Sequence, residues 1–285
     1  AIANPADLER SLAFADFAAQ TGMHDIACRA YSYSAKLFEY MNDSSDLPPQ
    51  IYLPWALSAY NSQNSRQNCF EILKTRRETG GFDLTLESIA GLALLKQSQT
   101  GNALDILTAA VSLAESTFNN PNKTNHQVAP AQIAWFYSFV LPDSEKAIAW
   151  ANKAYSADPF SDEIKSLLAY ALTQKESRNE ENGLANELVL ELLNANDTSP
   201  LHETNQIAAT AMANFLIKTG KTDQAMEKLK EAVEMAPYSI AAEKAVTKLA
   251  SLGIKYDHQD QGPAIAESLR EEFGRNFVPD FMPLD

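Results

Sequence analysis

The sequence is poor in glycine and cysteine, and both shortages narrow the class of protein. Only 10 glycines occur among 285 residues, and no segment alternates apolar and polar residues as a strand does, which excludes a sheet-rich fold. The two cysteines, Cys28 and Cys69, form no Cys-x-x-Cys pair, which excludes a disulfide framework and a thiol-based zinc site. No apolar run approaches the ~20 residues of a membrane-spanning helix. We therefore expect a helical chain without a membrane span.

Positive charge is also scarce. The chain has 23 Lys and Arg against 37 Asp and Glu, which gives a formal net charge of −14. Binding to a phosphate backbone requires a clustered basic face, and the only dense basic run, residues 74–77, is typical of a solvated helix end. We therefore expect no nucleic-acid partner.

Motifs for catalysis and for cofactors are absent as well. The sequence contains no HExxH, no Gly-rich phosphate loop, no GxSxG and no EF-hand loop. A catalytic histidine needs an orienting partner, but the four histidines lie in or beside predicted turns and far apart in the sequence: His24, His126, His202 and His258. The sequence thus predicts no enzyme, no metal site and no cofactor.

What the sequence does contain is a helical period that repeats in pairs. Apolar residues recur at three- and four-residue spacing along most of the chain. In the clearest pair, residues 206–239, a first helix over 207–218 ends at Gly220, and a second helix begins at Thr222, which we expect to cap it. The second helix and the turn after it carry a small, a large and a small residue and a proline at fixed offsets: Ala225, Leu229, Ala232 and Pro237.

The same offsets recur upstream. They are met in full by Ala147, Ala151, Ala154 and Pro159, and in part by Gly91, Leu94, Ala103, Leu107 and Ala110. Another partial match surrounds Ala27, and weaker matches surround Cys69 and Leu188. Over residues 8–239 this pattern resembles the tetratricopeptide repeat (TPR), a helix-turn-helix unit of about 34 residues. The resemblance implies an all-α solenoid of about six repeats, stacked in a right-handed superhelix, and a protein that binds other proteins.

The TPR-like solenoid is expected to occupy residues 1–253. Three insertions, residues 42–49, 116–127 and 176–183, are rich in Asn, Ser, Asp and Pro, as loops are. A helix over 240–252, stopped by Gly253, is expected to cap the last repeat. Residues 254–285 are expected to form a linker, a short helix over 263–273 and an extended tail over 276–285. The tail carries Phe277, Phe281 and Met282, and it either docks on the array or a neighbouring molecule or is a disordered end.

Both cysteines fall in or beside the small-residue positions of second helices, where a thiol packs like a small apolar side chain. We therefore expect buried, free thiols that lie in separate repeats, distant from each other. A disulfide between Cys28 and Cys69 would refute this repeat register.

The resemblance also implies where a partner binds. In TPR proteins the first helices line a concave groove, and the matching residues here are Ser88, Leu92, Gln132, Phe136, Phe139, Ser166, Tyr170, Thr173, Thr210, Asn214 and Lys218. The paired cations with which some family members clamp a C-terminal carboxylate are missing at these positions. Amide and hydroxyl groups beside aromatic rings suit an extended peptide. For Phe136 and Phe139 the alternative is a place in the repeat core.

The sequence thus predicts a protein-protein interaction scaffold that binds a peptide or protein segment and forms part of a larger chain or assembly. Two alternatives remain open: a passive structural spacer within a larger protein, and an enzyme of unfamiliar type. The residues identify neither the partner, the compartment nor the oligomeric state.

Overall fold

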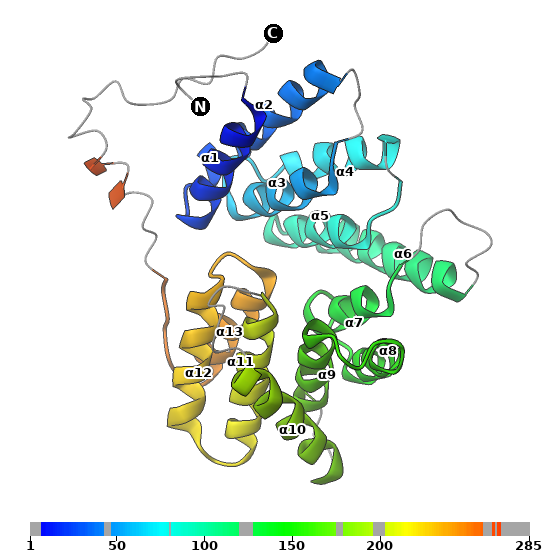
Figure 1. Cartoon of the computed structure of the whole chain (residues 1–285), viewed down its shortest axis with the longest axis vertical. Helices are drawn as coiled ribbons and strands as arrows, with labels where there is room; N and C mark the ends of the chain where they lie inside the picture. The colour runs from blue at the N-terminus through cyan, green and yellow to red at the C-terminus, as the bar shows by residue number, and fades with distance from the viewer. Residues whose placement is uncertain are drawn as a thin grey trace. The chain divides into compact units, whose positions relative to one another are not determined.

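Helices make up the regular structure of the chain. The computed structural model describes residues 7–42, 47–79, 81–119, 128–174, 179–195, 203–258, 264–265 and 267–268, and no strand occurs in these ranges. The predicted all-α fold is confirmed, with helices packed on their neighbours as in a helical repeat solenoid (Figure 1). The helices are α1 (Leu8–Gln20), α2 (His24–Asn42), α3 (Pro49–Asn61), α4 (Asn68–Thr79), α5 (Leu84–Lys96), α6 (Thr100–Asn119), α7 (Pro130–Phe139), α8 (Ser144–Ala157), α9 (Asp162–Gln174), α10 (Asn179–Ala195), α11 (Glu203–Lys218), α12 (Thr222–Met235) and α13 (Ile240–Ser251).

The chain divides into two compact units. Unit 1 comprises Ala1–Thr108 and Gln259–Asp285, and unit 2 comprises Ala109–His258. In unit 1, α1 packs on α2, α3 packs on α4, and α5 packs on both α3 and α4. Unit 2 contains the pairs α7–α8, α9–α10 and α11–α12, with α13 packed on α12. The division falls within the segment that the sequence predicts as one solenoid, so a single array over residues 1–253 stays a prediction.

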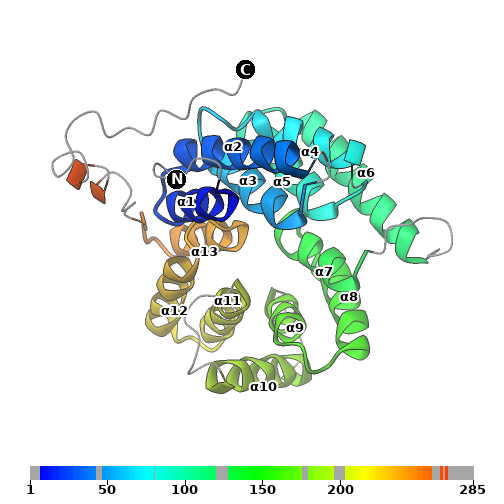
Figure 2. The same ribbon diagram turned by 45° about the horizontal axis from the view of Figure 1, so that its top comes forward.

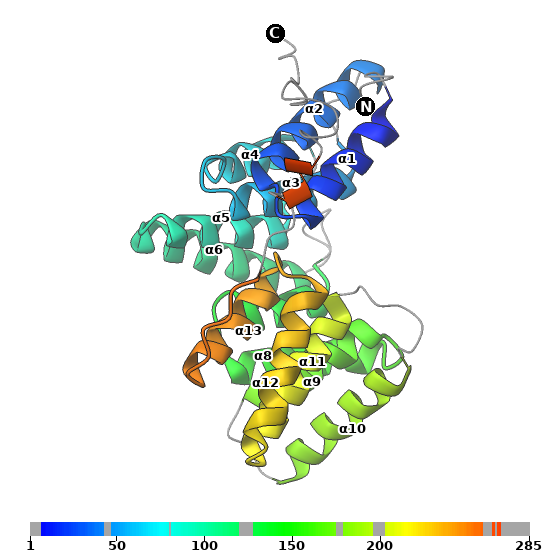
Figure 3. The same ribbon diagram turned by 90° about the vertical axis from the view of Figure 1, so that its left-hand side faces the viewer.

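In unit 2 the first helices of the pairs form an inner layer. α7 contacts α9, α9 contacts α11, α11 contacts α13, and α13 contacts α7. The second helices α8, α10 and α12 lie around this layer (Figure 2). Within a pair the two helices lie side by side, as α11 and α12 do (Figure 3). The first helices therefore have neighbours on more sides than the second helices have.

Four helices, α1, α5, α11 and α13, end in the same turn. Two residues after each helix a residue has a positive φ: Gly22 (82°), Ser98 (62°), Gly220 (76°) and Gly253 (84°). The next N–H then donates to a carbonyl five residues back, from Met23 to Ala18, Gln99 to Leu94, Lys221 to Leu216 and Ile254 to Leu249, over 2.9–3.0 Å. This is a Schellman ending, in which glycine avoids the steric cost of a positive φ. At these four helices a backbone conformation is repeated, whereas α3 and α7 end differently.

In the clearest pair the helix ends on either side of the turn agree with the sequence, whereas α11 begins at Glu203, four residues before the predicted start. α11 ends at Lys218, and α12 begins at Thr222 as predicted. The predicted cap is wrong, however, because Lys221 takes the N-cap position and makes no side-chain hydrogen bond there. The turn at Gly220 leaves only one residue before the helix, so Thr222 already lies inside it. At α13 the cap is a side chain: Ser239 accepts the N–H of Ala242.

Two of the predicted loops are shorter than expected. α6 continues to Asn119 and α10 begins at Asn179, so residues 116–119 and 179–183 are helical. In α6 the cause is packing, because Thr117 is buried and Phe118 meets Trp150 edge to face at 5.1 Å. Of the predicted helix over 263–273, residues 264–265 and 267–268 are described and are helical. The predicted tail, residues 276–285, lies outside the described residues.

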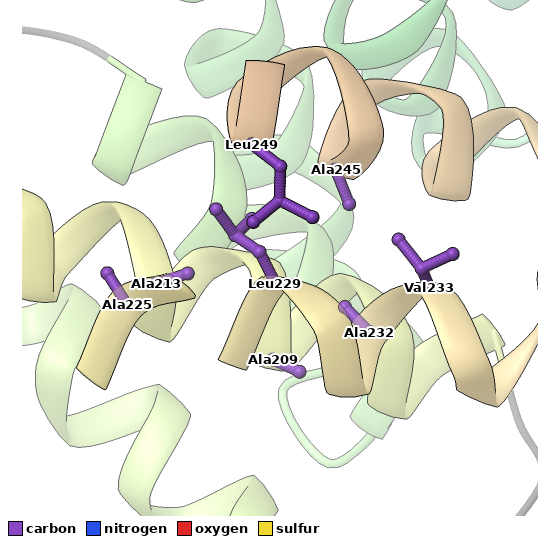
Figure 4. Close-up of a cluster of buried hydrophobic side chains, with 8 residues drawn as sticks. All are labelled: Ala209, Ala213, Ala225, Leu229, Ala232, Val233, Ala245 and Leu249. Carbon is purple, nitrogen blue, oxygen red and sulfur yellow. The ribbon is translucent and has the colours of Figure 1, made fainter. Parts of the chain in front are cut away.

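First and second helices differ in how much of their surface is buried. α9 is buried at nine consecutive residues, 165–173, whereas α12 buries only Ala225, Leu229, Ala232 and Val233. These four pack with Ala209 and Ala213 of α11 and with Ala245 and Leu249 of α13 (Figure 4). Small side chains at the crossings allow the helices to approach closely. A helix buried on every side belongs to the core, and a helix buried along one stripe belongs to the surface.

Candidate functional site

The residues predicted to line a groove lie mostly in the interior. Nine of the eleven are buried: Ser88, Leu92, Phe136, Phe139, Ser166, Tyr170, Thr173, Thr210 and Asn214. Only Gln132 and Lys218 are exposed. In unit 2 this burial follows from the inner layer, where first helices contact one another. The binding role of the set stays a prediction.

Two rings of the predicted groove stack on each other. Phe139 of α7 and Tyr170 of α9 have ring centroids 4.5 Å apart and an interplanar angle of 26°. Trp135 packs against Phe139 at 6.0 Å, and Phe136 meets Tyr137 edge to face at 5.6 Å. Burial raises the pKa of the Tyr170 hydroxyl. This packing favours the alternative that Phe136 and Phe139 belong to the repeat core.

The buried polar residues of the set bond mainly to their own helices. The hydroxyls of Ser166, Thr173 and Thr210 each donate to a backbone carbonyl one turn earlier, over 2.7–2.8 Å. Asn214 Nδ2 also donates to Thr173 Oγ1 at 3.5 Å, which joins α11 to α9. In unit 1 the Ser88 hydroxyl donates to a carbonyl of α5 at 2.6 Å. A hydroxyl that donates to the preceding turn has a hydrogen-bond partner without water, so these residues can be buried at little energetic cost.

The two exposed members of the set lie at helix ends. The side-chain carbonyl of Gln132 accepts the N–H of Ala129 at 3.1 Å, at the start of α7. Lys218 is in the last turn of α11, where a positive charge is favourable because the helix dipole is negative there. Both therefore have a structural role besides any role in binding.

On the outer side of unit 2, sequence reasoning missed a carboxylate that holds two rings. Glu115 Oε1, on α6, accepts hydrogen bonds from Tyr137 Oη at 2.9 Å and from Trp150 Nε1 at 3.2 Å. Burial raises the pKa of Tyr137, and its bond to Glu115 raises it further against the opposing effect of Lys146. One carboxylate thus fixes side chains of α7 and α8 together.

Two exposed lysines of α8 lie on these rings. Lys153 Nζ is 3.7 Å from the centroid of the Trp150 ring and 5.6 Å from that of Phe118. Lys146 Nζ is 4.8 Å from the centroid of Tyr137 and donates to its hydroxyl at 3.3 Å. Ring contact orders the lysine stems while the charged heads remain in solvent. The sequence carries a signal for this arrangement. Steps of four and then three residues place Lys146, Trp150 and Lys153 on one face of a helix.

The turn after α8 exposes a large aromatic side chain. Phe160 is 86% exposed, although its backbone is held in place, because Asp158 Oδ1 accepts the Phe160 N–H at 3.1 Å. Ser161 immediately precedes α9, and its hydroxyl accepts the N–H of Ile164 at 3.4 Å. Because the backbone is held, only the side chain of Phe160 has to be ordered when a partner covers its ring.

The two cysteines are free and buried, as predicted. They are neighbours and not distant, because Asn68, the residue before Cys69, donates from Nδ2 to Cys28 Sγ at 3.6 Å. Burial, with a smaller contribution from Cys28, raises the pKa of Cys69 to about 12. The cause of the proximity is the turn before α4, where Ser62, Asn64 and Ser65 bond to Asp25 of α2. The Cys69 thiol is therefore a protonated packing group at neutral pH.

Within the described residues, no group of three or more His, Cys, Asp or Glu side chains is placed to hold a metal ion. None of the helices in the described part of the chain is both long enough and apolar enough to cross a membrane.

Comparison with known proteins does not assign the chain to a family. No family model matches the sequence, and no curated protein matches it either. A proposal for the function therefore has to rest on the residues and the geometry described above.

Proposed function

We propose that the chain is a TPR-type protein-binding scaffold which holds an acidic segment of a partner protein on the outer side of α8. The TPR type is supported by the shared Schellman turns and by the small residues at the helix crossings. In this proposal the buried first helices form a rigid frame, and the partner contacts the exposed faces of second helices.

The observation that carries the proposal is the pair of lysines held on rings. Lys146 and Lys153 are seven residues apart on one helix, which places them about 10 Å apart along its axis. Each is ordered by an aromatic ring, and both rings are held by Glu115. Two ordered ammonium groups on a chain with a net charge of −14 offer fixed cationic contacts to the carboxylates of an acidic segment.

The neighbourhood of the lysines adds an apolar contact to the charged ones. Phe160 lies three residues after the end of α8 and is exposed on a turn that Asp158 holds in place. An acidic peptide with one large apolar side chain would pair its carboxylates with the lysines and pack that side chain on the ring.

Selection from a display library of random peptides tests the proposal. We expect the enriched peptides to be rich in Asp and Glu with an apolar residue among them. The variant Lys146→Ala/Lys153→Ala should weaken their binding roughly tenfold, because it removes two exposed charge contacts. The matched control is Lys228→Ala/Lys230→Ala on α12, where the lysines pair with Glu231 and Glu227. Equal loss in both variants, or no acidic enrichment, contradicts the proposal.

A second candidate, a passive spacer, is favoured by one specific observation. Nine of the residues that TPR proteins would present in a groove are buried in this chain: Ser88, Leu92, Phe136, Phe139, Ser166, Tyr170, Thr173, Thr210 and Asn214. A spacer would enrich no peptide in the selection above, and removal of a helix pair would change only the separation of the segments at its two ends.

A further inference from the structure

The end of unit 2 departs from the repeat. α13 ends at Gly253 in the same turn as α1, α5 and α11. After those three helices the next helix begins two residues beyond the positive-φ residue, at His24, Thr100 and Thr222. The residues that follow Gly253 differ, because residues 254–258 have no helical structure. A short non-helical segment therefore follows α13 at the place where the pattern has a second helix.

This segment, residues 254–258, packs against unit 2 through every other residue. Ile254, Tyr256 and His258 are partly buried, whereas Lys255 and Asp257 are exposed. Alternation of this kind is the pattern of an extended backbone lying on a surface. Ile254 and Tyr256 pack against the cluster drawn in Figure 4, in which Leu249 of α13 meets Leu229 of α12. The segment thus covers apolar surface that belongs to the last two helices.

One carboxylate on α12 binds the two partly buried polar side chains of the segment. Glu234 Oε1 accepts a hydrogen bond from Tyr256 Oη, and His258 Nδ1 lies 3.1 Å from the same oxygen. The His258 ring also meets Tyr238 edge to face, with centroids 5.7 Å apart. Burial raises the pKa of Glu234, but the bonds from Tyr256 and His258 outweigh it and the pKa is lowered. The bond to Glu234 raises the pKa of Tyr256 to about 12.

We propose that residues 254–258 form a detachable strap over the end of unit 2. The carboxylate of Glu234 holds this strap in place. The geometry concentrates the polar attachment in a single exposed side chain, whereas the helices around it are held by many buried contacts. Loss of that one carboxylate releases the strap without unfolding α12 or α13. Release uncovers the apolar surface beneath Ile254 and Tyr256, on which a second helix packs elsewhere in the repeat.

Limited trypsin digestion of the full chain, read by mass spectrometry, tests the strap. Lys255 lies in the middle of the strap, and trypsin cleaves after it only when the strap leaves α12. Glu234→Ala should speed cleavage after Lys255 at least tenfold, because both attachments are lost together. Tyr256→Phe keeps the ring and its packing but removes one attachment, so its effect should be smaller and still measurable.

Two controls separate strap release from other causes. Glu231→Ala removes a carboxylate from the same helix that pairs with Lys228, and cleavage after Lys255 should stay at the wild-type rate. Lys244 and Lys248 of α13 report on unfolding of the helix itself, and cleavage after them should not change in any variant. The strap is refuted if Glu234→Ala behaves like Glu231→Ala, if Lys244 and Lys255 become sensitive together, or if wild-type Lys255 is cut as fast as in a free peptide.

Discussion

The first and second helices of the pairs have different surroundings. α9, a first helix, is buried over residues 165–173, and it holds its serine and threonine hydroxyls in bonds to its own carbonyls. α8, a second helix, buries four residues, Ala147, Trp150, Ala151 and Ala154, and exposes its lysines. The comparison shows that position within the pair, and not hydrophobicity alone, decides which side chains can meet a partner.

The largest loss of stability is expected from a substitution where two first helices share an aromatic contact. Phe139 is fully buried and stacks on Tyr170, so Phe139→Ala should lower the free energy of unfolding by about 3–5 kcal/mol. Phe160→Ala removes the same ring from an exposed turn and should change it by less than about 0.5 kcal/mol. Urea denaturation followed by circular dichroism measures both. Similar losses in the two variants would break the distinction between interior first helices and exposed surface.

Smaller changes in stability are expected when either of two glycines in neighbouring helices is replaced by alanine. A Cβ on Gly91 of α5 would lie 2.5 Å from Cγ of Leu107, which is itself fully buried. Gly91→Ala should therefore cost about 1–3 kcal/mol of unfolding free energy. Gly101→Ala in α6 meets no atom within 4 Å and should stabilise the helix by roughly 0.5 kcal/mol.

Thermal unfolding of the two glycine variants compares the helices directly, since the chemical change is the same. In the double variant Gly91→Ala/Leu107→Ala the clash disappears, so its loss should be smaller than the sum of the two single losses. Strict additivity would show that the close approach of α5 and α6 is absent in solution.

The smallest effect is expected at the turn that ends α5. Ser98 has a φ of 62°, where the equivalent residues after α1 and α11 are glycines. Ser98→Gly should raise the free energy of unfolding by about 0.5 kcal/mol, because relief of the left-handed backbone outweighs the added freedom of the unfolded chain. Gly220→Ala, at the matching turn, should lower it by about 1 kcal/mol. Melting temperatures that move in the same direction for both variants would contradict a shared turn.

Much of the fold could be predicted from the sequence, and the candidate site could not. Gly220 and the alanines that follow it give the end of α11 and the course of α12, because these features depend on local backbone preferences. The burial of Thr173 and Asn214 depends instead on how α9 and α11 meet, for which the sequence carries no local signal. A threonine that bonds to its own helix looks the same in a sequence as one that faces a ligand.

The contact between α13 and α7 has a consequence for how unit 2 folds. In an open solenoid each repeat touches only its neighbours, so stability is a sum of local terms and the ends unravel independently. Here the last helix meets the first helix of the inner layer, some hundred residues earlier. A contact between helices so far apart in the sequence forms slowly, because the long stretch of chain between them must be ordered first. Unit 2 should accordingly fold and unfold as one cooperative body, with the arrival of α13 as its final step.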